Sequence, residues 1–255
     1  VAVVAGRVTM TPHRPIPRTH RIGGIGMKRH THLFQYLALG VIAIGMSAPA
    51  WAASFSFSRI YIEYNASAND LGYHVTLDGE DWKTLKIINP VGNTIFDVVG
   101  RGAYNDLGMT ELFFEGAEPS LEDFPLDDLL ALFPEGKYKF TGLTVGGTRI
   151  TSTGTLTHAI PAGPPVSAEV DDDTVVIRWE AVTGPPAGFP NRRIEIVGYQ
   201  VIVEPFQVTL PATSREVTLP REFVESLKRG VHPFEVLAIE VGGNQSITEG
   251  TFETE

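Results

Sequence analysis

The 255-residue sequence contains no cysteine. Disulfide bonds, thiolate nucleophiles and cysteine-ligated zinc are therefore excluded, and so is a lipoprotein anchor, which needs a cysteine to acylate. A secreted protein without disulfides depends on its hydrophobic cores for stability. That situation is more typical of bacterial export than of small animal extracellular domains.

Long apolar runs are also scarce, and the run at residues 33–46 is shorter than the roughly 20 residues that span a bilayer. It follows Met27, Lys28 and Arg29, and the small residues Ala50 and Ala52 come after it. This order is typical of a secretory signal peptide. We therefore predict a signal peptide at 27–52, cleaved after Ala52, and a periplasmic or extracellular protein with no membrane association after cleavage. An uncleaved anchor is the alternative.

Residues 1–26 lack carboxylates and a hydrophobic period, but contain four arginines, two histidines and three prolines. We interpret them as a disordered upstream leader, read in frame before a start at Met27. A long basic n-region is the alternative. Neither interpretation enters the fold argument.

Basic residues are few after residue 52, where 14 Lys and Arg stand against 30 Asp and Glu, a net charge of −16. An acidic surface repels phosphate backbones, and no basic stripe interrupts it. Nucleic acid is therefore excluded as a partner. The apolar content is high enough for packed cores, so intrinsic disorder is not expected.

Three prolines within residues 161–165 mark a boundary between two β-rich parts, because proline fixes φ and cannot donate to a sheet. We predict an all-β fold of two tandem β-sandwich domains, at 53–160 and 161–255. One helix is expected in the first domain, capped by Ser120 and running over 121–132. Asp78-Gly79 and residues 89–93 have turn chemistry. The strands expected in the first domain are 55–65, 73–77, 85–88, 94–99, 110–114, 137–140 and 149–158.

The second domain shows about seven short strands with regular turn signals, a pattern typical of an immunoglobulin-like sandwich. Pro164-Pro165, residues 175–179 ending in Trp179, 199–201 and 234–238 resemble the fibronectin type III family in order and spacing. The resemblance implies that Trp179 is buried and that residues 242–246 form a turn. Two departures are Phe234, where the family usually has tyrosine, and an inserted helical turn at 220–229. The family is a scaffold with many uses, so the resemblance implies no particular function.

The first domain resembles a group of uncharacterised secreted bacterial β-rich proteins through the Leu-Asp-Gly-Glu-x-Trp segment at 77–82. That resemblance implies export and no chemistry.

Four carboxylates near the predicted turn, Asp70, Asp78, Glu80 and Asp81, are the candidate metal ligands. Oxygen ligands in loops suit Ca²⁺, although the twelve-residue calcium-loop pattern is not met. The alternative is a solvated acidic turn, with no cofactor at all.

Trp82 follows the same turn, where an exposed indole could stack on a sugar ring or a partner. Tyr61, Tyr64, Tyr73 and Tyr104 add further aromatic side chains. On alternating strands, however, such residues usually belong to a core.

Catalytic patterns are weak. Glu111, Glu115 and Glu118 suggest a glycosidase pair, but residues 111 and 115 on one strand lie about 13 Å apart. Residues 171–173, three aspartates, favour a solvated turn over a metal site. No Gly-x-Ser-x-Gly elbow, His-x-x-x-His pair or phosphate loop occurs, and only His74, His158 and His232 follow residue 52. We predict no catalytic residue and no enzymatic activity.

The sequence therefore favours an exported, non-catalytic binding or structural protein with an unidentified protein or glycan partner at the cell surface. A carbohydrate-binding accessory module, using Trp82 and Ca²⁺, is the alternative. A deep pocket with convergent carboxylates would instead indicate a hydrolase.

Overall fold

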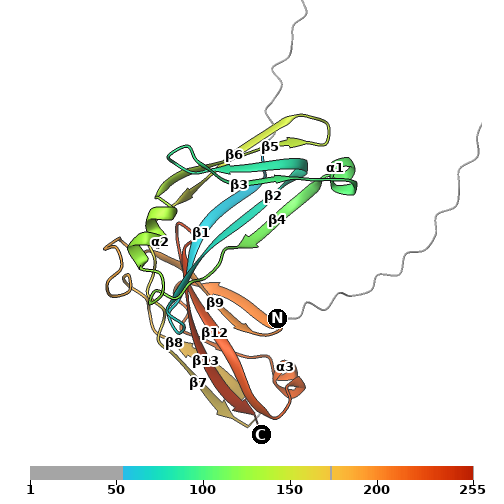
Figure 1. Ribbon diagram of the computed structural model, residues 1–255. Coiled ribbons are helices and arrows are strands. Elements are labelled where there is room, and N and C mark those ends of the chain that lie inside the picture. The colour runs from blue at the N-terminus through green and yellow to red at the C-terminus, as the bar shows by residue number, and fades with distance from the viewer. Residues whose placement is uncertain (1–53, 173, 255) are drawn as a thin grey trace, which may run out of the picture. The chain divides into compact units, whose positions relative to one another are not determined.

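The computed structural model describes residues 54–172 and 174–254. The predicted leader and signal peptide lie outside these residues. The described chain is almost entirely β, with strands β1 (Phe57–Asn65), β2 (Asp70–Ile88), β3 (Thr94–Val99), β4 (Met109–Glu115), β5 (Gly136–Thr144), β6 (Arg149–Leu156), β7 (Val166–Asp171), β8 (Thr174–Trp179), β9 (Ile196–Val203), β10 (Phe206–Pro211), β11 (Glu216–Thr218), β12 (Gly230–Glu240) and β13 (Gln245–Thr254). Its three short helices are α1 (Ala103–Leu107), α2 (Leu126–Leu132) and α3 (Arg221–Ser226). The predicted all-β sandwich class is confirmed (Figure 1).

The second half of the chain, from β7 to β13, is a sandwich of two antiparallel sheets. Strands β11, β8 and β7 form one sheet, and β10, β9, β12 and β13 form the other. Alternate side chains of both sheets point inward and make one core, which includes Trp179, Tyr199 and Phe234. The burial expected for Trp179 is confirmed, since only 4% of this residue is exposed. α3 occupies the helical turn expected at 220–229.

The long strand β2 organises the first half. Its N-terminal part pairs with β1 and β4, and its C-terminal part pairs with β3 and β5. The register shifts between Asp78 and Trp82, so the turn chemistry at Asp78-Gly79 marks an irregularity inside one strand and not the end of a strand. The prediction of two separate strands at 73–77 and 85–88 was therefore wrong.

Gly79 is needed at this irregularity because Phe55 packs against it. A Cβ atom at residue 79 would come within 2.7 Å of the Phe55 ring. The turn expected at residues 89–93 is present, and there the side chain of Asn89 accepts a hydrogen bond from the backbone N–H of Asn93 at 2.8 Å.

The helix predicted over 121–132 is shorter than expected and begins at Leu126. Ser120 caps a separate turn, in which its Oγ accepts a hydrogen bond from the N–H of Glu122 at 3.2 Å. Pro125, which has no N–H to donate, then precedes the first turn of α2. Sequence reasoning missed α1 and β10.

The two halves share one sheet although they keep separate cores. β1 pairs in parallel with β13, so ten strands form a continuous sheet (Figure 1). The buried members of the first core lie within residues 55–160 and those of the second within 175–252, although Phe189 of the second half also packs against the first core. The predicted boundary at residues 160 and 161 falls between these cores and stays a prediction.

Candidate functional site

Strands β1, β2 and β4 carry different chemistry on their two faces. In register, Ile60, Val75 and Phe114 form one row, and Tyr61, His74 and Glu115 form the next. Because successive side chains of a strand point to opposite faces, the first row faces the core and the second faces away from it.

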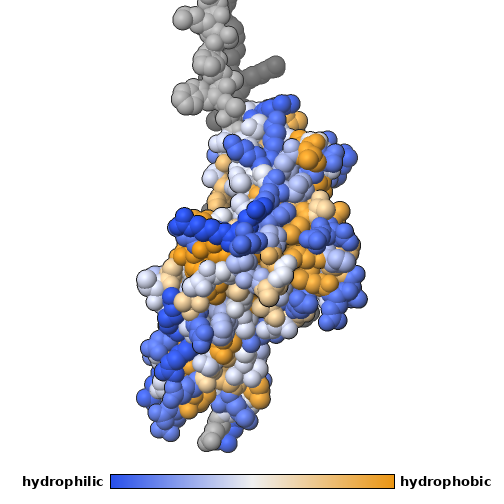
Figure 2. Space-filling view, turned by 90° about the vertical axis from the view of Figure 1, so that its left-hand side faces the viewer, coloured by the Kyte–Doolittle hydropathy of each residue, from blue (hydrophilic) through white to orange (hydrophobic). Residues whose placement is uncertain are grey.

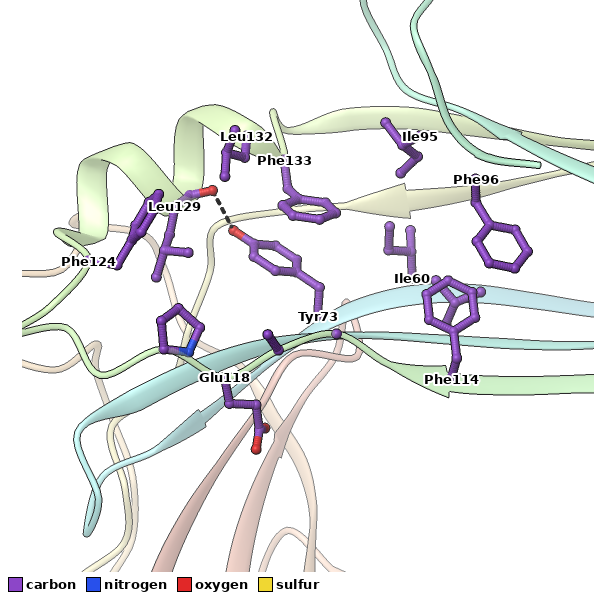
Figure 3. Close-up of a pocket in the computed structure, with 14 residues that line it drawn as sticks. Ile60, Tyr73, Ile95, Phe96, Phe114, Glu118, Phe124, Leu129, Leu132 and Phe133 are labelled. Carbon is purple, nitrogen blue, oxygen red and sulfur yellow. Dashed lines mark hydrogen bonds between the residues drawn. The ribbon is translucent and has the colours of Figure 1, made fainter. Parts of the chain in front are cut away.

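The core-facing row lines a pocket of about 560 Å³. Strands β1 to β4 and helix α2 supply its walls, which are mostly aromatic and aliphatic side chains (Figure 3). Tyr73 stacks on Phe133 with 3.7 Å between ring centroids, and Phe96 stacks on Phe114 at 4.7 Å. The rings therefore hold one another in place around the pocket.

Very few polar groups reach this pocket. The Tyr73 hydroxyl donates a hydrogen bond to the carbonyl oxygen of Leu129 at 3.0 Å. Burial raises the pKa of this hydroxyl, so it stays protonated and its proton remains committed to that bond. Glu118 lies at the rim, but its carboxylate points away from the pocket (Figure 3). The chemistry of the interior is thus suited to an apolar group.

Hydrophobic side chains also reach the outer surface of the described chain. Figure 2 shows hydrophobic patches between hydrophilic residues on one face. Leu132 of α2, which lines the pocket, has 57% of its surface exposed. The pocket therefore opens to solvent beside α2.

The opposite face of the same strands is polar and crowded. The guanidinium of Arg59 lies 4.0 Å from the centre of the Tyr61 ring, and Tyr61 stacks on His74 with 4.9 Å between centroids. On β4, at the other side of β2, the ring of Phe113 has its centroid 5.9 Å from that of the His74 imidazole. The imidazole is thus fixed between two aromatic rings.

Carboxylates surround this imidazole. His74 Nε2 lies 3.6 Å from Glu63 Oε1 and 3.9 Å from Glu118 Oε1. Burial is the main cause that raises the pKa of Glu118 to about 7, and the charge of Glu115 is the next largest. Burial also raises the pKa of Glu63. Burial lowers the pKa of His74, which favours the neutral form of its imidazole.

The four predicted metal ligands do not form one site. Asp70 begins β2, and Asp78 lies eight residues further along a regularly paired strand, about 26 Å away. Asp78, Glu80 and Asp81 are exposed near the irregularity of β2. Asp70 instead belongs to the crowded face, where its charge contributes to raising the pKa of Glu118.

Trp82 is fully buried in the first core. Its candidate role in ligand stacking needs an exposed indole, which the structure does not provide, because strand pairing through the irregularity turns this side chain inward. The alternative, a core tryptophan, agrees with the structure.

The remaining candidates are dispersed. Glu115 lies opposite His74 and its charge helps to raise the pKa of Glu118, whereas Glu111 lies opposite Asp78, further along β4. His158 and His232 each contact a backbone carbonyl, those of Phe133 at 2.9 Å and Lys228 at 2.7 Å. Asp172 lies in an exposed turn between β7 and β8 with a φ of 48°.

Sequence reasoning missed the role of Glu63 and the position of His74. The turn between β1 and β2 spans residues 66–69, and counting outward from it pairs Tyr61 with His74. Recognising that hairpin would have placed Glu63 and His74 on one face.

Among the described residues, no helix is long and apolar enough to cross a membrane.

Comparison with known proteins gives only distant likenesses. No family model and no curated protein matches the chain. Three similar solved structures are the Clostridium perfringens spore cortex lytic enzyme SleM, the fibronectin(III)-like modules of Clostridium thermocellum CbhA, and a Ca²⁺-stabilized ice-binding adhesin of an Antarctic bacterium.

The identities to these three are 18%, 11% and 12%, with TM-scores of 0.30, 0.25 and 0.27. The matches cover 37%, 79% and 78% of this chain, and 28%, 90% and 49% of the other chains. The chain thus spans less than a third of the lytic enzyme. At these values the likenesses establish neither a family nor an activity.

Proposed function

We propose that this is an exported, non-catalytic binding protein whose first half takes an apolar small molecule, such as an alkyl chain or an aromatic ring. The observation that carries this proposal is the pocket of about 560 Å³. Its size lies within the range of small-molecule sites, about 300–1,000 Å³. Its walls offer stacked rings and aliphatic side chains, while its tyrosine hydroxyl is already hydrogen-bonded.

The second half serves as a fibronectin type III-like structural module in this proposal. Three strands face four across one core, as in seven-stranded immunoglobulin-like sandwiches. The export signal at residues 27–52 and the cell-surface partner, a protein or a glycan, stay predictions from the sequence. Carbohydrate binding through Trp82 is not proposed, because that side chain is buried.

Fluorescence titration of the full chain with N-phenylnaphthylamine, a neutral probe that brightens in apolar surroundings, tests the proposal. We expect a saturable rise in emission with one probe bound per chain. Leu132→Glu should weaken binding about tenfold or more, because the new carboxylate would lose hydration when the probe enters. The substituted side chain is half exposed in the native protein, so the fold should tolerate the change.

Leu107→Glu is the matched control. Leu107 lies on α1 of the same half, is 77% exposed and does not line the pocket. Probe binding should therefore be unchanged in this variant. Absence of saturable binding, or equal binding by the Leu132→Glu variant, would show that the pocket is not a ligand site.

A further inference from the structure

The imidazole of His74 is buried without a hydrogen-bond partner. Only 4% of the residue is exposed, and neither ring nitrogen has a hydrogen-bond partner among the described residues. A neutral imidazole has one donor and one acceptor nitrogen, and buried polar groups are normally paired. A buried histidine of this kind requires an explanation.

The atoms nearest to Nε2 are carboxylate oxygens. Glu63 Oε1 at 3.6 Å and Glu118 Oε1 at 3.9 Å are too distant for hydrogen bonds. All three ligand atoms nevertheless lie within 4.8 Å of one another. Two ligands bound tetrahedrally at about 2.1 Å from one ion are separated by about 3.4 Å, so small side-chain movements would bring these atoms to coordination distance.

The chain holds each of the three side chains in place. His74 lies between the rings of Tyr61 and Phe113, and Gln245 of β13 donates a hydrogen bond to Glu63. Such partners orient the ligands of metal sites. Ligand positions on neighbouring strands are also more precise than positions on free loops.

Glu118 is positioned by the glycine beneath it. The side chain lies over Gly72 of β2, where a Cβ atom would come within 2.7 Å of both Glu118 Cγ and Oε1. A glycine inside a strand often marks a close approach of this kind. The absence of a side chain at residue 72 is therefore what admits the carboxylate.

We propose that His74 Nε2, Glu63 and Glu118 bind a divalent transition metal ion, with Zn²⁺ as the best match. Imidazole nitrogen suits Zn²⁺, Cu²⁺ and Ni²⁺, whereas Ca²⁺ takes six to eight oxygen ligands. Three protein ligands leave a fourth tetrahedral position, which water or the neighbouring Glu115 can take. The ion would join β1, β2 and the segment after β4, and would give His74 Nε2 its partner.

Calorimetric titration of the full chain, stripped with a chelator and dialysed, tests this site with Zn²⁺. We expect binding at a stoichiometry of one and a higher melting temperature with the ion, because a ligand that binds the native state stabilises it. Co²⁺ should produce the visible absorption of tetrahedral coordination. Tighter binding of Ca²⁺ than of Zn²⁺ would overturn the proposal.

Three variants separate this site from metal binding elsewhere on the chain. His74→Gln and Glu118→Gln should each lower the Zn²⁺ affinity about tenfold or more, since even outer partners of a metal site contribute that much. Gly72→Ala should do the same by displacing Glu118 without altering any ligand. Glu111→Gln is the control. Glu111 lies on the same face of β4 as Glu115, but it is opposite Asp78 and not opposite His74, so it is away from the proposed site.

The side chain of Glu118 is partly exposed, with 34% of its surface accessible, so the Glu118→Gln variant should remain folded. Circular dichroism would show whether it does. Unchanged Zn²⁺ binding in folded Glu118→Gln and His74→Gln variants would overturn the proposal. Of the three proposed ligands only Glu118 also lies at the rim of the pocket, and its carboxylate points away from it (Figure 3). Failure of either experiment therefore leaves the other proposal standing.

Discussion

The side chain of Asn244 accepts a hydrogen bond from the backbone N–H of Ile62 at 2.9 Å, and thereby fastens the turn before β13 to the middle of β1. The amide nitrogen of Asn244 donates to the carbonyl oxygens of Thr157 at 2.8 Å and Ala159 at 3.1 Å. Asn244 is 1% exposed. One buried amide thus connects the second half of the chain to β1 and to the end of the first half.

We expect Asn244→Ala to lower the free energy of unfolding by about 2–4 kcal/mol, because it leaves the Ile62 N–H and two carbonyls without their partner. Urea denaturation of the full chain measures the loss. Asn105→Ala on α1 is the control, since Asn105 is exposed and should change stability by less than about 0.5 kcal/mol. Equal effects of the two substitutions would contradict the role assigned to Asn244.

The second core is expected to depend on Trp179. This residue packs against Tyr199, with 5.5 Å between ring centroids, in the core between the two sheets. Trp179→Ala should lower the free energy of unfolding by about 3–5 kcal/mol, the usual loss for truncating a core aromatic. Denaturant melts measure it, with exposed Val170→Ala as the control. A loss below about 1 kcal/mol would be incompatible with the observed burial.

The sequence predicted the second half well because its structure follows from local patterns. Alternating apolar residues at 174–179 and turn residues at 242–244 indicate strands and their ends without knowledge of the partner strands. Trp179 could be assigned to the core for the same reason. β10 was missed, since its inward side chains are only half-buried and its alternation is weak.

The polar site could not be predicted from such patterns, because it depends on strand pairing. Glu63, His74 and Glu118 come from three segments that meet only when β1, β2 and β4 are in register. The acidic group at 70–81 looked dense along the sequence, but an extended strand spreads its members apart. Trp82 was similarly placed by the irregularity in β2, which no local pattern distinguishes from a turn.

A pH dependence of stability is expected from Glu240 at the end of β12. Burial raises the pKa of this carboxyl above its ordinary value, although its Oε2 accepts a hydrogen bond from the N–H of Gly242 at 2.7 Å. A raised pKa in the native state means that the protonated form is favoured on folding. The contribution of the Glu240 carboxyl to stability is therefore complete below its ordinary pKa, about 4.3. It is lost as the pH rises through the raised pKa that this carboxyl has in the folded protein.

Glu240→Gln should remove this loss of stability at rising pH, because glutamine does not ionise. The side-chain amide oxygen of the glutamine can still accept the hydrogen bond from the N–H of Gly242. The difference in unfolding free energy, variant minus native, should become more positive from pH 4 to pH 7 in chemical denaturation. Exposed Glu222→Gln on α3 serves as the control. A difference that does not change with pH, or that becomes more negative, would show that burial of Glu240 does not govern its ionisation.

The last prediction concerns the boundary at residues 160 and 161. Each half has its own core, and each piece, 53–160 or 161–255, has about 100 residues, a size at which domains fold alone. The halves are joined by one short strand pairing and by side-chain contacts, among them Asn244 with Ile62, Gln245 with Glu63, and the ring of Phe189 with that of Tyr64. β1 and β13 pair over three residue pairs, Glu63–Gln245, Tyr64–Ser246 and Asn65–Ile247.

We therefore expect each fragment to fold when expressed alone, with a cooperative thermal transition and dispersed amide spectra. Both should melt below the full chain, because separation removes the partners of Asn244 and exposes β13 as an edge strand. Asn244→Ala tests the same junction. The substitution should lower the stability of the full chain, and it should have a smaller effect in the 161–255 fragment, which lacks Ile62, Thr157 and Ala159. If either fragment is unfolded alone and folds only when mixed with the other, the shared sheet is indispensable and the chain from residue 53 is a single folding unit.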